Sequence, residues 1–560
     1  MEQDDSRFDE VFRSLQWKGW YQVTRCSVLL LFSVILAFNQ LSVIFIGNVP
    51  GYHCRELQSL NVTVNNVTLD VLSNASHRSY NVTYNQCSID VRNATDVILS
   101  TDCKGYDYDE DVSKSFVSEW DLVCEKEVMS DNVQLFYMLG EIFASLFLCQ
   151  LSDNYGRKPT LVWFSALALV TSILCAFPPN LIFLIVFKFL TGVFLSNACQ
   201  SAYTLLTEMM PTDYRALPET IKAFFYMTAM LITCLIAFLI QDWHWVQMTL
   251  ALLSAYVVIL HWFSDESIIW LCATKKYTQA EEIIRKIARV NEIDPHEALE
   301  ALKKMIVSRE SQDKDTIVLN GTLSADEESS ERERLIADDT IHWMDFVKNK
   351  NLLNLVLISS VLRFVATVGN QGLVFTSSSL TDNFYLGYSL GTLVEYPATL
   401  LFYLVVNRLG RKKCVYIFHY IAGTVLIISS LLLMPFAENL AGKFWLSFVL
   451  SLCGRWSISI CYPAVVLYTL ELFPTCVRNT GTGISDTASS VGTLISPYFR
   501  TLVRHVPWAP NVILGAMCVL APLTIRGLPE TKGRELPHTL EDMNKMMSKP
   551  QQEIKENSTN

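Results

Sequence analysis

Stretches of about twenty predominantly apolar residues recur along the whole chain, and each is long enough to cross a bilayer as an α-helix. A membrane β-barrel would instead show alternating segments of about ten residues. Only 18% of the residues are charged, whereas soluble domains carry about 25%. The sequence therefore predicts an all-α polytopic membrane protein. The twelve expected transmembrane helices cover approximately 21–47, 133–151, 160–177, 181–206, 222–241, 245–263, 351–375, 384–406, 414–434, 444–469, 482–502 and 510–527.

The polar segment 48–132, after the first expected span, has the features of a large extracellular loop. N-glycosylation sequons and disulfides belong to the extracellular or lumenal side of a membrane. An even number of cysteines predicts two disulfides, with three possible connectivities. The N-terminus before this span is then cytosolic, and the first span acts as a retained signal anchor. The sequons are at Asn61, Asn66, Asn74, Asn81 and Asn93, and the cysteines are Cys54, Cys87, Cys103 and Cys124.

Two sequence motifs occur twice, six spans apart. "LSDNYGRK" (Leu151–Lys158) and "VNRLGRKK" (Val406–Lys413) follow the second and eighth spans. "TLLTEMMPTDYR" (Thr204–Arg215) and "YTLELFPTCVR" (Tyr468–Arg478) end the fourth and tenth spans. The Arg- and Lys-rich loops face the cytosol by the positive-inside rule. Two six-helix bundles in the same orientation, with a binding site between them at the midplane, are the major facilitator architecture.

The repeats and the local composition divide the chain into consecutive parts. The linker begins with amphipathic sequence that predicts short helices and continues as a charge-rich segment that we expect to be flexible. The parts are a cytosolic N-terminus (1–20), a first six-helix bundle (21–263, including the loop 48–132), a cytosolic linker (264–350), a second six-helix bundle (351–527) and a cytosolic tail (528–560).

Further segments resemble the signatures of the organic cation, anion and carnitine transporters, solute carrier family 22 of the major facilitator superfamily. They are "SFVSEWDLVCEKE" (Ser115–Glu127), "DWHWVQM" (Asp242–Met248), "DESIIWL" (Asp265–Leu271), "LVEYPA" (Leu393–Ala398), "YTLELFPTCVRNTGTG" (Tyr468–Gly483) and "LPETKGRELPHTLEDM" (Leu528–Met543). The resemblance covers essentially the whole chain and implies polyspecific movement of small organic ions across the plasma membrane.

Four positions depart from the pattern of that family. Cys149 stands where the motif after span two usually has Gly, and Asn407 replaces the usual Asp of the second copy. Asp265 replaces a Pro, and His244 replaces an Arg. Of these changes, Asn407 weakens the charge pair expected in the second half.

The repeated motifs supply candidate gate residues at the cytosolic ends of the bundles. Charge contacts between helices there can favour one of two global states. Positive charge that only sets topology is the alternative explanation, but it leaves the repeated carboxylates unexplained. The candidates are Asp153, Arg157, Lys158, Glu208, Arg215, Arg411, Glu471 and Arg478.

Ionisable residues inside membrane spans mark candidate functional sites. In spans seven, eight, ten and eleven, polar residues recur at helical spacing, as a water-filled cavity between the halves requires. Aromatic rings can attract an ammonium group by about 0.5–2 kcal/mol. Lys188 is expected to be structural. The candidate substrate-binding residues are Asp486, Glu395, Arg363, Arg455, Asn370, Tyr226, Tyr388, Tyr462, Ser490 and Glu141.

Charge at span eleven suggests the substrate class. In the family, the position of Ser490 is Asp in cation transporters and Arg in anion and carnitine transporters. Here it is neutral, and Asp486 lies one turn earlier on the same face. Asp486 and Glu395 could bind an ammonium group. Arg363 and Arg455 could bind a carboxylate or neutralise the acids, and a structural Arg455–Glu395 pair is the alternative.

The sequence thus predicts a multi-pass plasma-membrane transporter of small organic cations or zwitterions (choline-, carnitine- or monoamine-like) that works by alternating access. Membrane potential would draw a cation inward with ~2.3 kcal/mol per charge per 100 mV. The alternatives are an organic anion exchanger and a transport-dead, receptor-like protein. No phosphate-binding loop, zinc spacing or catalytic triad is present, so we expect no enzyme, cofactor, metal or nucleic-acid partner. The expected partners are an organic ion, the lipid bilayer and a second copy bound through the extracellular loop.

Overall fold

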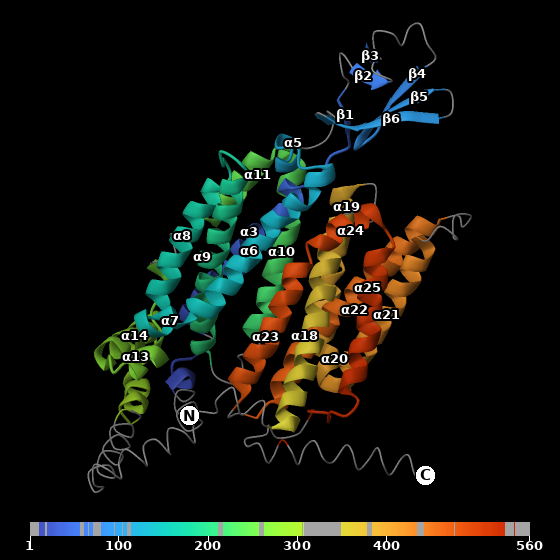
Figure 1. Ribbon diagram of the computed structural model, residues 1–560. Coiled ribbons are helices and arrows are strands. Elements are labelled where there is room, and N and C mark those ends of the chain that lie inside the picture. The colour runs from blue at the N-terminus through green and yellow to red at the C-terminus, as the bar shows by residue number, and fades with distance from the viewer. Residues whose placement is uncertain are drawn as a thin grey trace, which may run out of the picture.

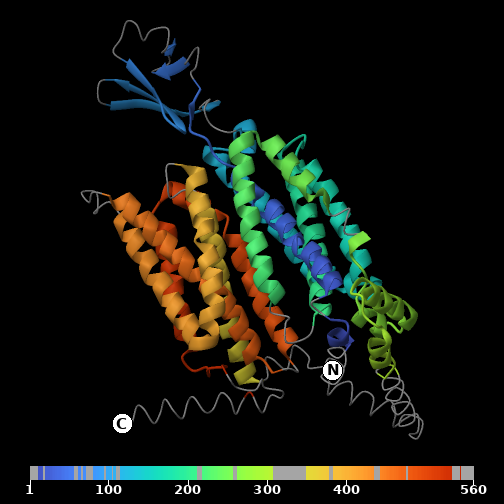
Figure 2. The ribbon, with the colours of Figure 1, turned by 180° about the vertical axis from the view of Figure 1, so that it is seen from behind.

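The computed structural model consists of two bundles of long helices standing side by side (Figures 1 and 2). A small group of strands lies at one end, the strand end, and short helices of the linker lie at the other, the linker end. The predicted residues Asn66, Asn74 and Arg215 and the charge-rich part of the linker lie outside the described residues. The structure describes 11–16, 19–55, 61–64, 67–70, 80–93, 96–103, 105–108, 114–210, 217–256, 262–304, 306, 349–377, 383–433, 442–474, 477–532 and 543.

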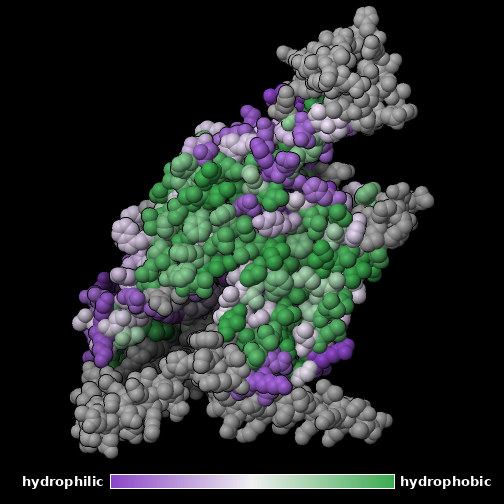
Figure 3. All heavy atoms as spheres, in the orientation of Figure 1, coloured by the Kyte–Doolittle hydropathy of each residue, from purple (hydrophilic) through white to green (hydrophobic). Residues whose placement is uncertain are grey.

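The first bundle is built from apolar helices in the order of the expected spans. Its surface is hydrophobic across the middle and hydrophilic toward both ends, and the second bundle continues the same band (Figure 3). Its helices are α2 (Trp20–Leu30), α3 (Phe32–Ile46), α6 (Glu127–Phe147), α7 (Cys149–Tyr155), α8 (Arg157–Leu174), α9 (Leu181–Glu208), α10 (Leu217–Ile240) and α11 (Trp243–Leu253).

The second bundle repeats this arrangement. Seven helical segments in the described part of both bundles are long and apolar enough to cross a membrane. Helices α6 and α23 are not among the seven, and both carry acidic residues within their length, Glu141 and Asp486. The helices are α18 (Lys350–Ser377), α19 (Phe384–Leu393), α20 (Glu395–Leu409), α21 (Arg411–Leu433), α22 (Lys443–Leu472), α23 (Arg478–Ile495), α24 (Tyr498–His505) and α25 (Ala509–Leu520), followed by the 3-10 turn η5 (Ala521–Ile525).

Strands form within the polar segment that the sequence analysis treated only as a loop. Short runs rich in β-branched residues, such as "NVTV" and "VTLD", favour extended backbone. The predicted disulfides are present and join Cys54 to Cys103 and Cys87 to Cys124. The antiparallel pairings are β1 (Tyr52–Cys54) with β7 (Tyr106–Tyr108), β2 (Asn61–Val64) with β3 (Val67–Asp70), and the sheet β4 (Tyr80–Tyr84), β5 (Ser88–Asn93) and β6 (Asp96–Asp102) in that order.

The linker helices α13 (Ile268–Ala273) and α14 (Tyr277–Val290) dock on the first bundle. Asp265 accepts hydrogen bonds from the Tyr21 hydroxyl and the Lys286 ammonium group, each at 2.6 Å. Burial raises the pKa of Asp265, but hydrogen bonds from Lys286 and Tyr21 outweigh burial, and the pKa lies below its ordinary value. The departure from the family pattern at Asp265 therefore ties α14 to α2.

Candidate functional site

A cavity of about 380 Å³, the central pocket, lies between the two bundles. Helices α3, α6, α9 and α10 supply one wall and α23 supplies the other. In the space-filling view, the surface is hollowed between the bundles toward the linker end (Figure 3). The lining residues are Leu36, Gln40, Met138, Glu141, Ile142, Ser145, Ser196, Cys199, Gln200, Tyr203, Lys222, Ser490 and Thr493.

Close packing of two glycines fixes the position of Glu141 in this wall. A Cβ added at Gly140 would lie 2.2 Å from the Phe189 carbonyl oxygen, and one at Gly192 would lie 2.2 Å from that of Tyr137. The backbones of α6 and α9 therefore touch, and the residue after Gly140 faces the pocket edge. Among the described residues, the Glu141 side chain forms no ion pair.

The predicted charges of the second bundle are paired with each other. Arg455 donates from Nε and Nη2 to Glu395 Oε1 at 2.8 and 2.6 Å. Arg363 pairs with Asp486 and also donates from Nε to Thr469 Oγ1 at 2.9 Å. The Arg455–Glu395 pair that the sequence suggested is present, and Arg363 has an equivalent partner.

The two acidic residues of these pairs differ in their accessibility. The Asp486 side chain is 59% exposed, whereas that of Glu395 is 13% exposed. Ser490, one turn from Asp486, lines the central pocket and donates its hydroxyl to the Asp486 carbonyl oxygen at 3.0 Å. Asp486 thus remains accessible near the pocket, while Glu395 is largely enclosed.

The predicted tyrosines do not form one cage. Tyr226 donates its hydroxyl to Gln40 Oε1 at 3.0 Å and has Glu141, Glu395 and Arg455 as charged neighbours. Tyr388 is fully buried, and its hydroxyl has no hydrogen-bond partner among the described residues. Tyr462 packs against the core of the second bundle. The Tyr226 hydroxyl reaches the lining of the central pocket through its hydrogen bond to Gln40.

Asn370 lies on α18 and is partly exposed. It is one turn from Thr367, whose hydroxyl is hydrogen-bonded to that of Ser489 on α23. This contact joins α18 to α23, and Asn370 is not among the residues that line the central pocket.

Aromatic rings close the strand end between the bundles. Phe45 of α3 lies 5.7 Å from Phe384 and 4.8 Å from Tyr388 of α19, measured between ring centroids. Phe238 of α10 lies 5.4 Å from Tyr385. Such edge-to-face pairs add stabilisation to burial, so the rings form an apolar roof over the site.

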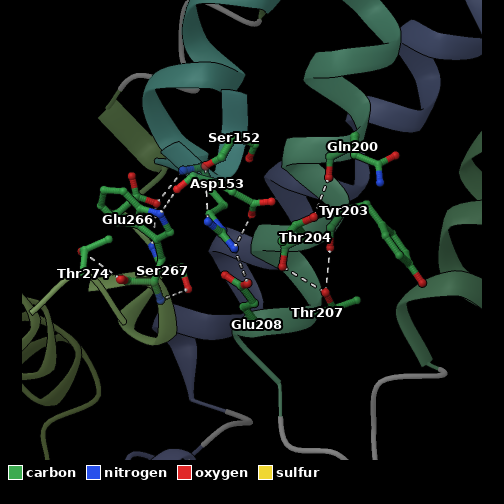
Figure 4. Close-up of polar contacts among 12 residues, drawn as sticks. Ser152, Asp153, Gln200, Tyr203, Thr204, Thr207, Glu208, Glu266, Ser267 and Thr274 are labelled. Carbon is green, nitrogen blue, oxygen red and sulfur yellow. Dashed lines mark hydrogen bonds and ion pairs between the residues drawn. The ribbon is translucent and has the colours of Figure 1, made fainter. Parts of the chain in front are cut away.

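Charged residues of the first repeated motif gather at the linker end (Figure 4). The Arg157 guanidinium lies 3.0 Å from Asp153 and 3.3 Å from Glu208. Glu266 accepts from the backbone N–H groups of Arg157 and Lys158 at 3.0 and 3.3 Å. A carboxylate at this position satisfies the free N–H groups at the start of α8.

The second bundle contains the same construction. Arg411 donates from Nε to Glu471 at 3.2 Å, and the backbone N–H groups of Arg411 and Lys412 donate to Glu530 at 2.8 and 3.3 Å. The helix-capping carboxylates Glu266 and Glu530 were missed as a repeat in the sequence. The signal is an acid followed by Ser or Thr directly after the last span of each half.

Glycine at the start of these motif helices has a steric reason. Gly156 and Gly410 have φ of 108° and 94°, a region that residues with a Cβ rarely adopt. A Cβ would also lie 2.5 Å from Glu266 at Gly156 and 2.7 Å from Glu530 at Gly410. The glycine allows the carboxylate to approach the helix N-terminus.

The fold and the pocket between paired bundles define a multi-pass transporter of the major facilitator superfamily, not an enzyme. The family model "Sugar (and other) transporter" matches residues 57–544, and the chain belongs to this family. The xylose transporter XylE from E. coli, in an inward open conformation, has the same fold, with a TM-score of 0.58, 15% identity and coverage of 93% of this chain and 98% of that one.

The chain is also similar to curated relatives of solute carrier family 22 along almost its full length. It is 26% identical to the "Organic cation transporter protein" of Drosophila melanogaster, covering 97% of this chain and 95% of the relative. It is 28% identical to "Organic cation/carnitine transporter 2" of Mus musculus, covering 96% and 94%. "Organic anion transporter 3" of Oryctolagus cuniculus is also 28% identical, covering 96% and 93%.

Proposed function

We propose that this transporter carries small organic cations or zwitterions across the plasma membrane by alternating access, and that Glu141 selects their positive charge. The main support for this proposal is that Glu141 lines the central pocket without an ion-pair partner among the described residues. A carboxylate in a membrane is costly unless a cation, a proton or another polar group compensates it. A substrate ammonium group would supply that compensation.

The names of the relatives include cation, carnitine and anion transporters, so they do not decide the charge of the substrate. The proposal therefore rests on the charged residues of this chain. An anion exchanger would need a cationic side chain available to the substrate without an acid beside it, and Lys222 shares the pocket lining with Glu141. Arg455 and Arg363 are each held by a carboxylate of the same bundle. Removing the partner of a buried pair is costly, which disfavours Arg455, whose partner Glu395 is largely enclosed, as an anion site.

Lys222 favours zwitterions as a second substrate class. Its ammonium group lies 4.8 Å from the centroid of the Tyr203 ring, and both residues line the central pocket. A substrate with an ammonium at one end and a carboxylate at the other could contact Glu141 and Lys222 together.

We also propose that the strand end is extracellular and the linker end cytosolic. The sequons at Asn61, Asn81 and Asn93 are then presented on strands outside the cell. The two bundles, 21–263 and 351–527, rock against each other around the central pocket. The linker 264–350 and the tail 528–560 remain inside.

The motif residues would form the inner gate when the linker end closes. In this conformation, Arg157 Nε and Glu208 Oε2 are buried without hydrogen-bond partners among the described residues. Closure against the other bundle would bring partners to such atoms. We assign this role to Asp153, Arg157, Lys158, Glu208, Arg411 and Glu471, with Arg478 at the start of α23.

The test is uptake of a radiolabelled choline-like cation and of a para-aminohippurate-like anion by cells that express the full chain. We expect the cation to enter and Glu141→Gln to lower its uptake more than about tenfold, because a charge-assisted contact is lost. Glu297→Gln removes the same charge from an exposed position of the linker and should change nothing. Anion uptake that is unaffected by Glu141→Gln, without cation uptake, would contradict the proposal.

A further inference from the structure

A second cluster of charged residues lies at the strand end, where α6 of the first bundle meets α24 of the second. Arg504 donates from Nη1 to Glu127 Oε1 at 2.8 Å, and His505 Nε2 lies 2.9 Å from Glu127 Oε2. One carboxylate therefore holds two basic residues that belong to the other bundle. We call this cluster of Glu127, Arg504 and His505 the seam.

The contacts around the seam also cross between the bundles. Tyr498 donates its hydroxyl to Asn132 Oδ1 at 2.9 Å, and Thr501 donates to Asp131. Arg500 donates from Nη2 to the Gly47 carbonyl oxygen at 2.6 Å. Outward opening must separate α24 from α6 and α3, so these contacts hold the strand end closed.

His505 is the imidazole of the seam, and its Nε2 faces the Glu127 carboxylate. An imidazole gains its positive charge between pH 5 and 8, depending on its surroundings. The His505 side chain is 66% exposed, and a cavity of about 400 Å³ beside it is lined by Tyr52, Glu127 and Arg504 as well. Protons from the solvent at the strand end can therefore reach it.

The neighbouring charges show what protonation adds. Among the described residues, the charged and titratable groups around the seam are Glu127 and Asp131 from α6, Arg500 and Arg504 from α24, and the hydroxyl of Tyr52 from β1. The two acids and the two arginines balance, so a protonated His505 adds a positive charge directly against Glu127. Neutral His505 can keep a hydrogen bond but loses this ion pair.

We propose that His505 and Glu127 form an extracellular proton-binding site that controls outward opening. The closed seam gives protonated His505 a carboxylate partner, and the open seam removes it. The closed state is therefore favoured when His505 is protonated, at acidic external pH, and this stabilisation is lost when His505 gives up its proton. The proposal rests on the outward placement of the strand end but not on the identity of the substrate.

Hydrogen–deuterium exchange of α24 in the purified full chain measures seam opening without any substrate. After correction for the intrinsic pH dependence of exchange, we expect opening of wild-type α24 to be about fivefold lower at pH 5.5 than at pH 8. This factor corresponds to the largest contribution that an exposed ion pair usually makes. His505→Asn should remove this difference. His296→Asn changes an exposed histidine of the linker and should retain it.

Two further variants distinguish loss of the His505–Glu127 pair from a general weakening of the seam. Arg504→Gln should raise α24 exchange at every pH but keep the dependence on pH, whereas Glu127→Gln should raise exchange and abolish the dependence. A pH effect that survives His505→Asn, or wild-type exchange that is equal at both pH values, would overturn the proposal. Because exchange needs no transport, these results are independent of the Glu141→Gln uptake test.

Discussion

The two ends of the molecule use similar charged residues in different ways. At the linker end, the ion pairs among the described residues join partners within one half, as in Arg157–Glu208 and Arg411–Glu471. At the strand end, Arg504–Glu127 joins the two halves. The linker-end networks shape each half, whereas the strand-end contacts hold the halves together on one side. Among the described residues, the two halves are therefore joined by an ion pair at the strand end, whereas the surface between them is hollowed toward the linker end (Figure 3).

Charge reversal at the strand end should have the largest effect on this comparison. Glu127→Lys would replace the carboxylate with a positive charge against Arg504, and like charges in contact cost several kcal/mol. We expect more than about tenfold faster exchange of α24, measured by hydrogen–deuterium exchange. Adding Arg504→Glu restores an opposite-charge pair and should restore the protection of α24. Equal exchange rates of α24 in the single and the double variant would contradict the role of the seam.

Removal of a helix-capping carboxylate at the linker end should lower the stability of the protein without changing the exchange of α24 at the seam. Glu530→Ala leaves the backbone N–H groups of Arg411 and Lys412 without their acceptor. We expect about 2 kcal/mol of lost stability in thermal unfolding, because hydrogen bonds to charged groups contribute about 1.5–3 kcal/mol. Glu266→Ala should behave alike, since the construction is repeated. Faster α24 exchange in either variant would show that the two ends are not separate.

The smallest expected effect comes from an exposed member of the linker-end network. The Asp153 side chain is 70% exposed, and that of Glu208 is 17% exposed, although both lie beside Arg157. Exposed ion pairs contribute little, so Asp153→Asn should change the free energy of unfolding by less than about 0.5 kcal/mol. Glu208→Gln should cost more. Equal costs in the same unfolding measurement would mean that burial does not separate the two contacts.

Much of the architecture could be predicted from the sequence. Apolar runs and repeated motifs predict the all-α major facilitator fold, because each span must satisfy its backbone within the membrane. The cysteine count predicts two disulfides but not that Cys54 pairs with Cys103. The strands around Asn61 and Asn81 were not predicted, because short β-branched runs inside a polar loop give a weak signal.

The site could be predicted only as a set of candidates. Arg363 and Asp486 lie on α18 and α23, 123 positions apart in sequence, and helix packing, not spacing along the chain, brings them into contact. The same holds for Arg455 and Glu395. The spacing of polar residues therefore identified the right helices, but it could not show that Glu141, among these acids, is the one without an arginine.

The current carried by substrate under voltage clamp tests the central proposal most directly. In cells that express the wild-type chain, a choline-like cation should produce an inward current that grows with negative potential, since its charge moves through the field. Glu141→Gln should reduce this current more than about tenfold, while Glu141→Asp should keep part of it. A full current with Glu141→Gln, or an outward current carried by an anion, would contradict selection of cations by Glu141.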